Sequence, residues 1–170
     1  EDFNGTAIIT LYDATRSQTV VSDNRSEQMQ VQGGQLFRGP TPVVNGRFTI
    51  QFRVPKDIAY DSALARIHGY AYNDLEDAVG GSNHIMVYGS DTTTVVDTEG
   101  PKIKIFLDDR TFSSGDIVTP TPMLIVDLRD GSGINSSGAG IGHRIEAWID
   151  GAPNAIDLTD LYTTSPTDYR

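Results

Sequence analysis

The sequence contains no cysteine among its 170 residues. No disulfide can therefore stabilise the fold, and no thiolate can act as a catalytic nucleophile. Basic residues are also few, because 13 Lys and Arg stand against 23 Asp and Glu, for a net charge of −10. A field of that sign repels the phosphates of nucleic acids and the anionic surfaces of membranes. We therefore expect no nucleic-acid partner and no direct membrane insertion.

Long apolar segments are missing as well. No run of 18 apolar residues occurs, so no segment is predicted to span a bilayer. Residues 1–4 lack the basic region and apolar core of a signal peptide, and the first residue is not Met. We expect the chain to begin within a longer protein or after processing.

Sustained helical periodicity is absent, and turn residues are abundant. The 17 Gly and 8 Pro fall between short apolar runs, which is typical of an all-β protein. The clearest predicted strand covers residues 47–54, where apolar side chains alternate with polar ones. Asn45-Gly46 supplies a tight turn before it, and Pro55 ends it.

The other predicted strands suggest two modules. Residues 6–12, 65–72 and 85–88 belong to the first module, with residues 21–37 as a long, weakly ordered connection. Residues 102–107, 123–128, 143–150 and 155–158 belong to the second, and Asp150-Gly151 is a hairpin turn within it. The polar stretch 90–101 separates the two groups. We predict two tandem immunoglobulin-like or fibronectin-like β-sandwich modules, 1–93 and 94–170, the second incomplete because it falls short of about 100 residues.

Carboxylates are the main candidates for a metal site. Asp108, Asp109, Asp127 and Asp130 could converge from loops at one end of a sandwich around Ca²⁺, which takes six to eight oxygen ligands. The alternative is a solvated acidic rim. The histidines 68, 84 and 143 have no spacing typical of metal ligands. No cofactor other than this calcium ion is predicted.

Aromatic side chains are the candidates for partner binding. In the predicted strand 65–72, Tyr70 and Tyr72 share a face with His68, opposite Ile67. They either pack across strands or form a platform for a carbohydrate or a protein. Trp148 points away from the apolar face of its strand, so it either packs beneath a sheet or the glycine-rich loop, or is an exposed anchor for a partner.

Several segments together resemble a known family. The run DTEGPKIKIFL at 97–107, residues 127–149 with the blocks SGIN and GIGH, and residues 45–48 with 54–58 are similar to the late β-sandwich region of gingipain-family cysteine peptidases of the PorU type. That type includes the signal peptidase, or sortase, of the type IX secretion system of Bacteroidetes-like bacteria. It removes C-terminal signal domains from cargo, which is then passed to a cell-surface anchor.

The resemblance implies a parent protein whose catalytic Cys and His lie in a caspase-like domain before Glu1. No catalytic residue can be transferred to this chain. It would be a non-catalytic C-terminal accessory region, acting as a spacer or docking module in the periplasm or at the outer-membrane surface. Its implied partners are its own upstream peptidase domain and outer-membrane secretion-system proteins. The residues alone fit equally well a carbohydrate- or protein-binding adhesin-type module, or a structural stalk that binds nothing.

Overall fold

The structure is a computed structural model, and it describes residues 3–22, 25–55, 58, 64–88, 97–137, 144–165 and 168. Within these residues the regular structure consists of ten antiparallel strands and one turn of 3₁₀ helix, Thr159–Leu161. The predicted all-β fold is confirmed, and the antiparallel sheets are consistent with a β-sandwich. Among the described residues no helix is long and apolar enough to cross a membrane.

The chain packs as two compact units. One contains Glu1–Thr93 and Asn135–Tyr169, and the other contains Thr94–Ile134 and Arg170. The predicted boundary at 93/94 lies outside the described residues, so the domain limits remain a prediction. After residue 134 the C-terminal segment packs within the first unit. There the backbone N–H of Thr164 donates a hydrogen bond to the carbonyl oxygen of Arg38 at 2.6 Å.

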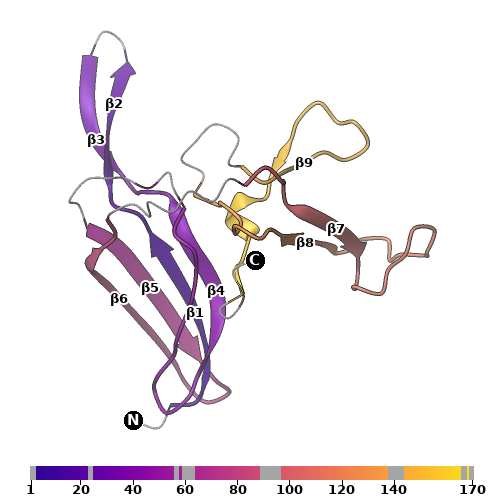
Figure 1. Cartoon of the computed structure of the whole chain (residues 1–170), viewed down its shortest axis with the longest axis horizontal. Coiled ribbons are helices and arrows are strands. Elements are labelled where there is room, and N and C mark those ends of the chain that lie inside the picture. The colour runs from indigo at the N-terminus through magenta and orange to yellow at the C-terminus, as the bar shows by residue number, and fades with distance from the viewer. Residues whose placement is uncertain are drawn as a thin grey trace. The chain divides into compact units, whose positions relative to one another are not determined.

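A four-stranded sheet forms the body of the first unit, with strand order β4-β1-β5-β6 (Figure 1). The strands are β1 (Gly5–Tyr12), β4 (Gln35–Val43), β5 (Leu64–Tyr72) and β6 (Asp77–Met86). Alternate residues of β1, namely Ala7, Ile9 and Leu11, are buried, as the period of two requires. The predicted strands 6–12 and 65–72 correspond to β1 and β5. Strand β6 begins well before the predicted segment 85–88.

The predicted strand at 47–54 does not form. The turn before it does, because Asn45 and Gly46 have φ values of 52° and 71°, but pairing stops at one Val44–Arg47 bridge. The segment instead packs on the buried face of the sheet, where Phe52 and Phe37 have ring centroids 5.4 Å apart. Phe48 is 45% exposed. Burial of part of this segment against the sheet face has taken precedence over ladder hydrogen bonds.

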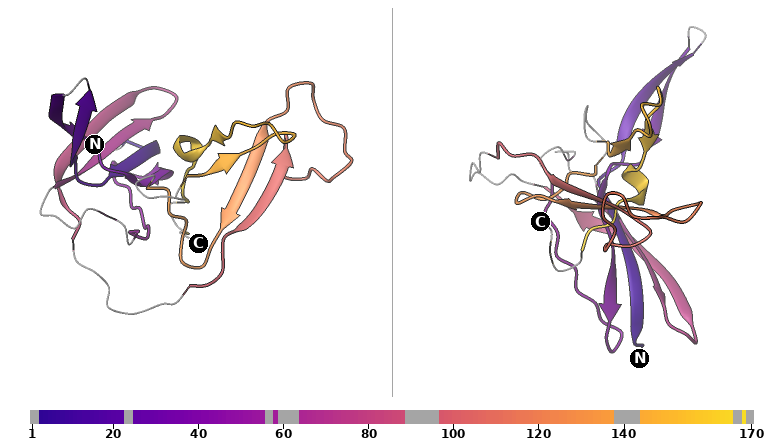
Figure 2. Two further views of the ribbon diagram at one scale, coloured as in Figure 1. Left: turned by 90° about the horizontal axis from the view of Figure 1, so that it is seen from above. Right: turned by 90° about the vertical axis from the view of Figure 1, so that its right-hand side faces the viewer.

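The predicted connection 21–37 was also wrong, since most of it is regular β-structure. Strands β2 (Arg16–Ser22) and β3 (Arg25–Val31) form a two-stranded hairpin, which extends beyond the sheet in Figure 1 and in the right view of Figure 2. Nearly all its residues are exposed. A hairpin that buries neither face needs no apolar alternation, so its sequence resembles a loop.

The remaining strands are short. In the first unit, β9 (Glu146–Ala147) pairs with β10 (Ile156–Asp157), and both are shorter than predicted. The predicted Asp150-Gly151 turn is present, with φ values of 49° and 69°. In the second unit, β7 (Lys102–Leu107) and β8 (Leu124–Arg129) form a separate antiparallel pair, close to the predicted strands 102–107 and 123–128.

Candidate functional site

The acidic candidates in the second unit are engaged one by one. The carboxylate of Asp108 accepts hydrogen bonds from the backbone N–H groups of Thr119 and Met123, each at 3.0 Å. These bonds stabilise the ionised form and lower the pKa of Asp108. Asp109 accepts from the hydroxyl and backbone N–H of Thr111, which lowers the pKa of Asp109 in the same way.

The other two candidates also have local partners. Asp127 receives two parallel hydrogen bonds from Arg110, with Nε–Oδ2 at 2.9 Å and Nη2–Oδ1 at 2.8 Å. Asp130 accepts from the backbone and hydroxyl of Ser132 at 2.7 and 2.8 Å. Among the described residues no group of three or more His, Cys, Asp or Glu side chains could hold a metal ion. Asp108, Asp109 and Asp130 accept hydrogen bonds within their loops, and Asp127 forms an ion pair with Arg110. Calcium binding stays a prediction.

Trp148 follows β9 and is 57% exposed. Its indole is thus accessible from solvent in the first unit, which leaves an anchoring role open. Residues 138–142 of the glycine-rich loop 131–142 that was expected to cover it, together with His143, lie outside the described residues.

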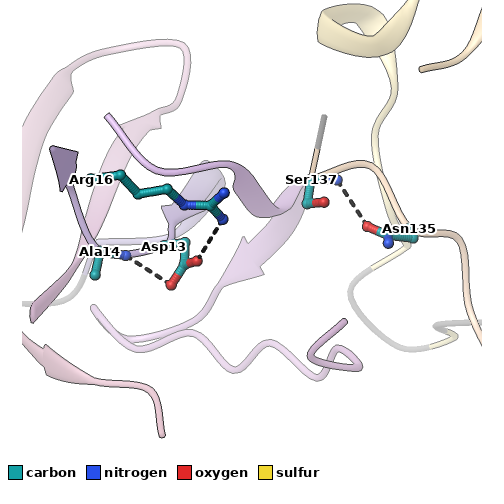
Figure 3. A network of polar contacts seen from close by, with 5 residues as sticks. All are labelled: Asp13, Ala14, Arg16, Asn135 and Ser137. Carbon is teal, nitrogen blue, oxygen red and sulfur yellow. Dashed lines mark hydrogen bonds and ion pairs between the residues drawn. The ribbon is translucent and has the colours of Figure 1, made fainter. Parts of the chain in front are cut away.

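A polar cluster at the base of the β2–β3 hairpin was not predicted from the sequence (Figure 3). It consists of Asp13 and its partners Ala14 and Arg16. Asp13 is 3% exposed, and its carboxylate accepts from the backbone of Ala14 at 2.8 Å and pairs with Arg16 at 3.3 Å. A Cβ added to Gly34 would stand 2.2 Å from the carbonyl oxygen of Ser137, so the two backbones touch. The cluster therefore fixes where the hairpin leaves the sheet.

The outer face of the four-stranded sheet, opposite the buried core, carries the predicted tyrosines. Tyr70 and Tyr72 are 41% and 40% exposed and stack with centroids 5.6 Å apart and planes inclined by 22°. Tyr12 meets His68 edge-on at 6.1 Å. The hydroxyl of Tyr70 donates a hydrogen bond to Asp77 at 3.1 Å, and this bond raises the pKa of Tyr70.

An open groove of about 640 Å³ runs over this outer face. Its lining includes Tyr12, His68 and Tyr70, with Arg38 contributed by β4. Its volume is in the range of ligand-binding clefts, which combine apolar rings with a few polar groups. The sequence predicted Tyr70 and Tyr72 as binding residues but missed Tyr12 and Arg38, because only the strand register brings them to the same place.

Comparisons with known proteins give one informative similarity. No protein-family model matches the chain, and no curated protein matches it. Among solved structures, the crystal structure of dimeric latent PorU from Porphyromonas gingivalis matches with a TM-score of 0.53 and 33% sequence identity. The match covers 98% of this chain and 16% of that protein, so the chain spans about a sixth of PorU. The chain is therefore similar over almost its whole length to one segment of PorU.

Proposed function

We propose that this chain is a non-catalytic accessory region of a secreted, gingipain-like cysteine endopeptidase that resembles PorU. The observation that carries the proposal is the coverage, 98% of this chain against 16% of PorU. In a protein of that kind the peptidase domain would lie in the larger remaining part. The chain itself has no cysteine to supply a thiolate nucleophile.

The β2–β3 hairpin is suited to dock this region on the rest of such a parent. Among the described residues it pairs with no other strand, and an isolated two-stranded hairpin is at best marginally stable in water. One face presents Val20 and Met29, which are 42% and 53% exposed, next to Glu27. Such a mixed face suits packing against another protein surface. The buried cluster around Asp13 would hold the hairpin in position for this contact.

The proposed setting follows from the same similarity. The region would work in the periplasm or at the outer-membrane surface of a Bacteroidetes-like bacterium. Its partners would be its own peptidase domain and the outer-membrane proteins of the secretion system. Between a spacer and a docking module, the exposed hairpin favours docking.

Hydrogen exchange tests the docking role. Amides of β2 and β3 should exchange at least 10-fold more slowly in the full-length parent than in the isolated chain, because docking would cover them. Val20→Glu should remove this protection, whereas Thr19→Glu, on the opposite hairpin face, should retain it. Equal exchange in both proteins would refute docking through the hairpin. Hydrolysis of peptides by the purified chain above buffer would refute the non-catalytic assignment.

The outer-face groove favours a second candidate function, a carbohydrate- or protein-binding adhesin-type module. Its exposed, mutually packed rings are the specific observation in favour. Micromolar binding on a glycan array, lost on Tyr70→Ala, is the expected result. The two functions are compatible in one protein, since the hairpin and the groove use different residues.

A further inference from the structure

We propose that the outer-face groove binds an acidic saccharide, with a sugar ring across the strands beside His68 and Tyr70 and its anionic group toward Arg38 and Arg66. This inference rests on the binding-module candidate and names its ligand class.

The strand register defines the groove. One row across the sheet is Arg38–Thr10–His68–Gly81, and the next is Pro40–Ile8–Tyr70–Val79. His68 and Tyr70 stand two residues apart on β5, so they share one face of the sheet, and both line the groove. Gly81 has no side chain, which leaves the groove open toward β6. An open groove across strands suits a chain of sugar units better than an enclosed small molecule.

The rings in the groove are held in place before any ligand arrives. Tyr70 is fixed by stacking on Tyr72 and by its hydrogen bond to Asp77, and His68 rests against the ring of Tyr12. Side chains that are already ordered lose less conformational entropy on binding. Aromatic rings with polar edges can pack on the C–H face of a sugar while hydrogen-bonding its hydroxyls.

The charge of this face is opposite to that of the chain. The net charge is −10, yet the four strands contain a single carboxylate, that of Asp77, and it is engaged by Tyr70. Arg38 and Arg66 both share the outer face with the rings, in register with Thr10 and Tyr12. A local basic patch on an acidic protein selects anionic over neutral ligands.

The charged side chain of Arg38 is also held in place by a hydrogen bond. Its guanidinium donates a hydrogen bond to the carbonyl oxygen of Asp160, which anchors the side chain at the end of the groove. A guanidinium has five N–H donors in a fixed fork. The donors that do not bind Asp160 can therefore form hydrogen bonds with a carboxylate or a sulfate of the ligand.

Calorimetry with matched ligands tests the inference. The purified chain is titrated with trigalacturonic acid, with its fully methylated ester, and with a heparin-derived tetrasaccharide. At low salt we expect at least one acidic ligand to bind at least 10-fold more tightly than the ester, and to weaken as salt is added. Tyr70→Ala and Arg66→Gln should each reduce the affinity at least 5-fold. Tyr88→Ala and Arg53→Gln, which alter exposed residues outside the groove, should leave it unchanged.

Thermal unfolding of every variant separates lost binding from lost folding, and Arg66→Gln alters an exposed side chain that is not part of the core. Equal affinity for acid and ester would retain a saccharide groove but overturn the choice of an anionic ligand. No binding of any saccharide, with Tyr70→Ala instead weakening contact with the parent peptidase domain, would make this face a protein interface and overturn the proposal. Neither result affects the hydrogen-exchange test of the hairpin.

Discussion

Truncation of Phe37 to alanine should be among the most destabilising single changes in the chain. Its side chain is 0% exposed and is one of the largest fully buried ones, together with Ile9. It packs against the ring of Phe52. Large-to-small changes of a buried phenylalanine cost about 3–5 kcal/mol, because transfer free energy and cavity formation add. That is a fifth or more of the stability of an ordinary domain, about 5–15 kcal/mol.

Two further phenylalanines provide matched controls. Phe48→Ala removes the same atoms from a side chain that is 45% exposed, so we expect a loss of about 1 kcal/mol or less. Phe52→Ala should lie between the two. A double-mutant cycle on Phe37 and Phe52 should give a coupling of about 0.5–1.5 kcal/mol, as expected for rings in contact. Urea unfolding followed by circular dichroism measures all four free energies.

The result that would refute this reasoning is a Phe48→Ala cost equal to that of Phe37→Ala. That outcome would place Phe48 in the core and restore residues 47–54 as a strand with its four apolar side chains on one buried face. A small cost at both positions would instead mean that the sheet face is not covered at all.

Three other changes have clear expected outcomes. Gly34→Ala should lower the free energy of unfolding by about 1–3 kcal/mol in urea, since the new Cβ would meet a backbone carbonyl oxygen, whereas Gly80→Ala has open space and should cost nothing. The pKa of Asp108 is lowered by backbone N–H donors, so its ionised form stabilises the fold above about pH 3.8, its ordinary value, and this contribution disappears as pH falls through the lower native pKa. Asp108→Asn should therefore flatten the acid branch of a stability–pH curve, and an unchanged branch would contradict the hydrogen bonds. The Asp77→Asn change should return the raised pKa of Tyr70 toward 10 in an absorbance titration, because the accepting carboxylate is gone.

The sequence predicted those strands whose two faces differ in chemistry. In β5 it separated Ile67 and Ala71 from Tyr70 and Tyr72, and the structure places the first pair toward the core. At residues 47–54 the same alternation was misleading. It shows that one side of a segment is apolar, but not whether that side joins a sheet edge or lies on a sheet face.

The groove was only partly predictable for a related reason. Tyr70 and Tyr72 are two residues apart in one strand, so their common face follows from the sequence. Tyr12 and Arg38 come from strands distant in sequence, and register alone places them beside His68. The near absence of carboxylates from the four strands is visible in the sequence, but only once the strands that pair are known. The polar cluster at Asp13 had a weak signal in Gly33-Gly34, which permits close backbone approach.

The central position of β1 has a consequence for how the chain acquires its fold. Both neighbours come later in the sequence, since Thr6 pairs with Pro42 on one side and with Tyr72 on the other. Closing loops of this length costs entropy before any contact compensates for it, so sheet formation should be slow for a chain of this size. During synthesis, β1 cannot obtain its second partner until β5 has left the ribosome. Over that interval its apolar side is a binding site for chaperones and a risk for aggregation.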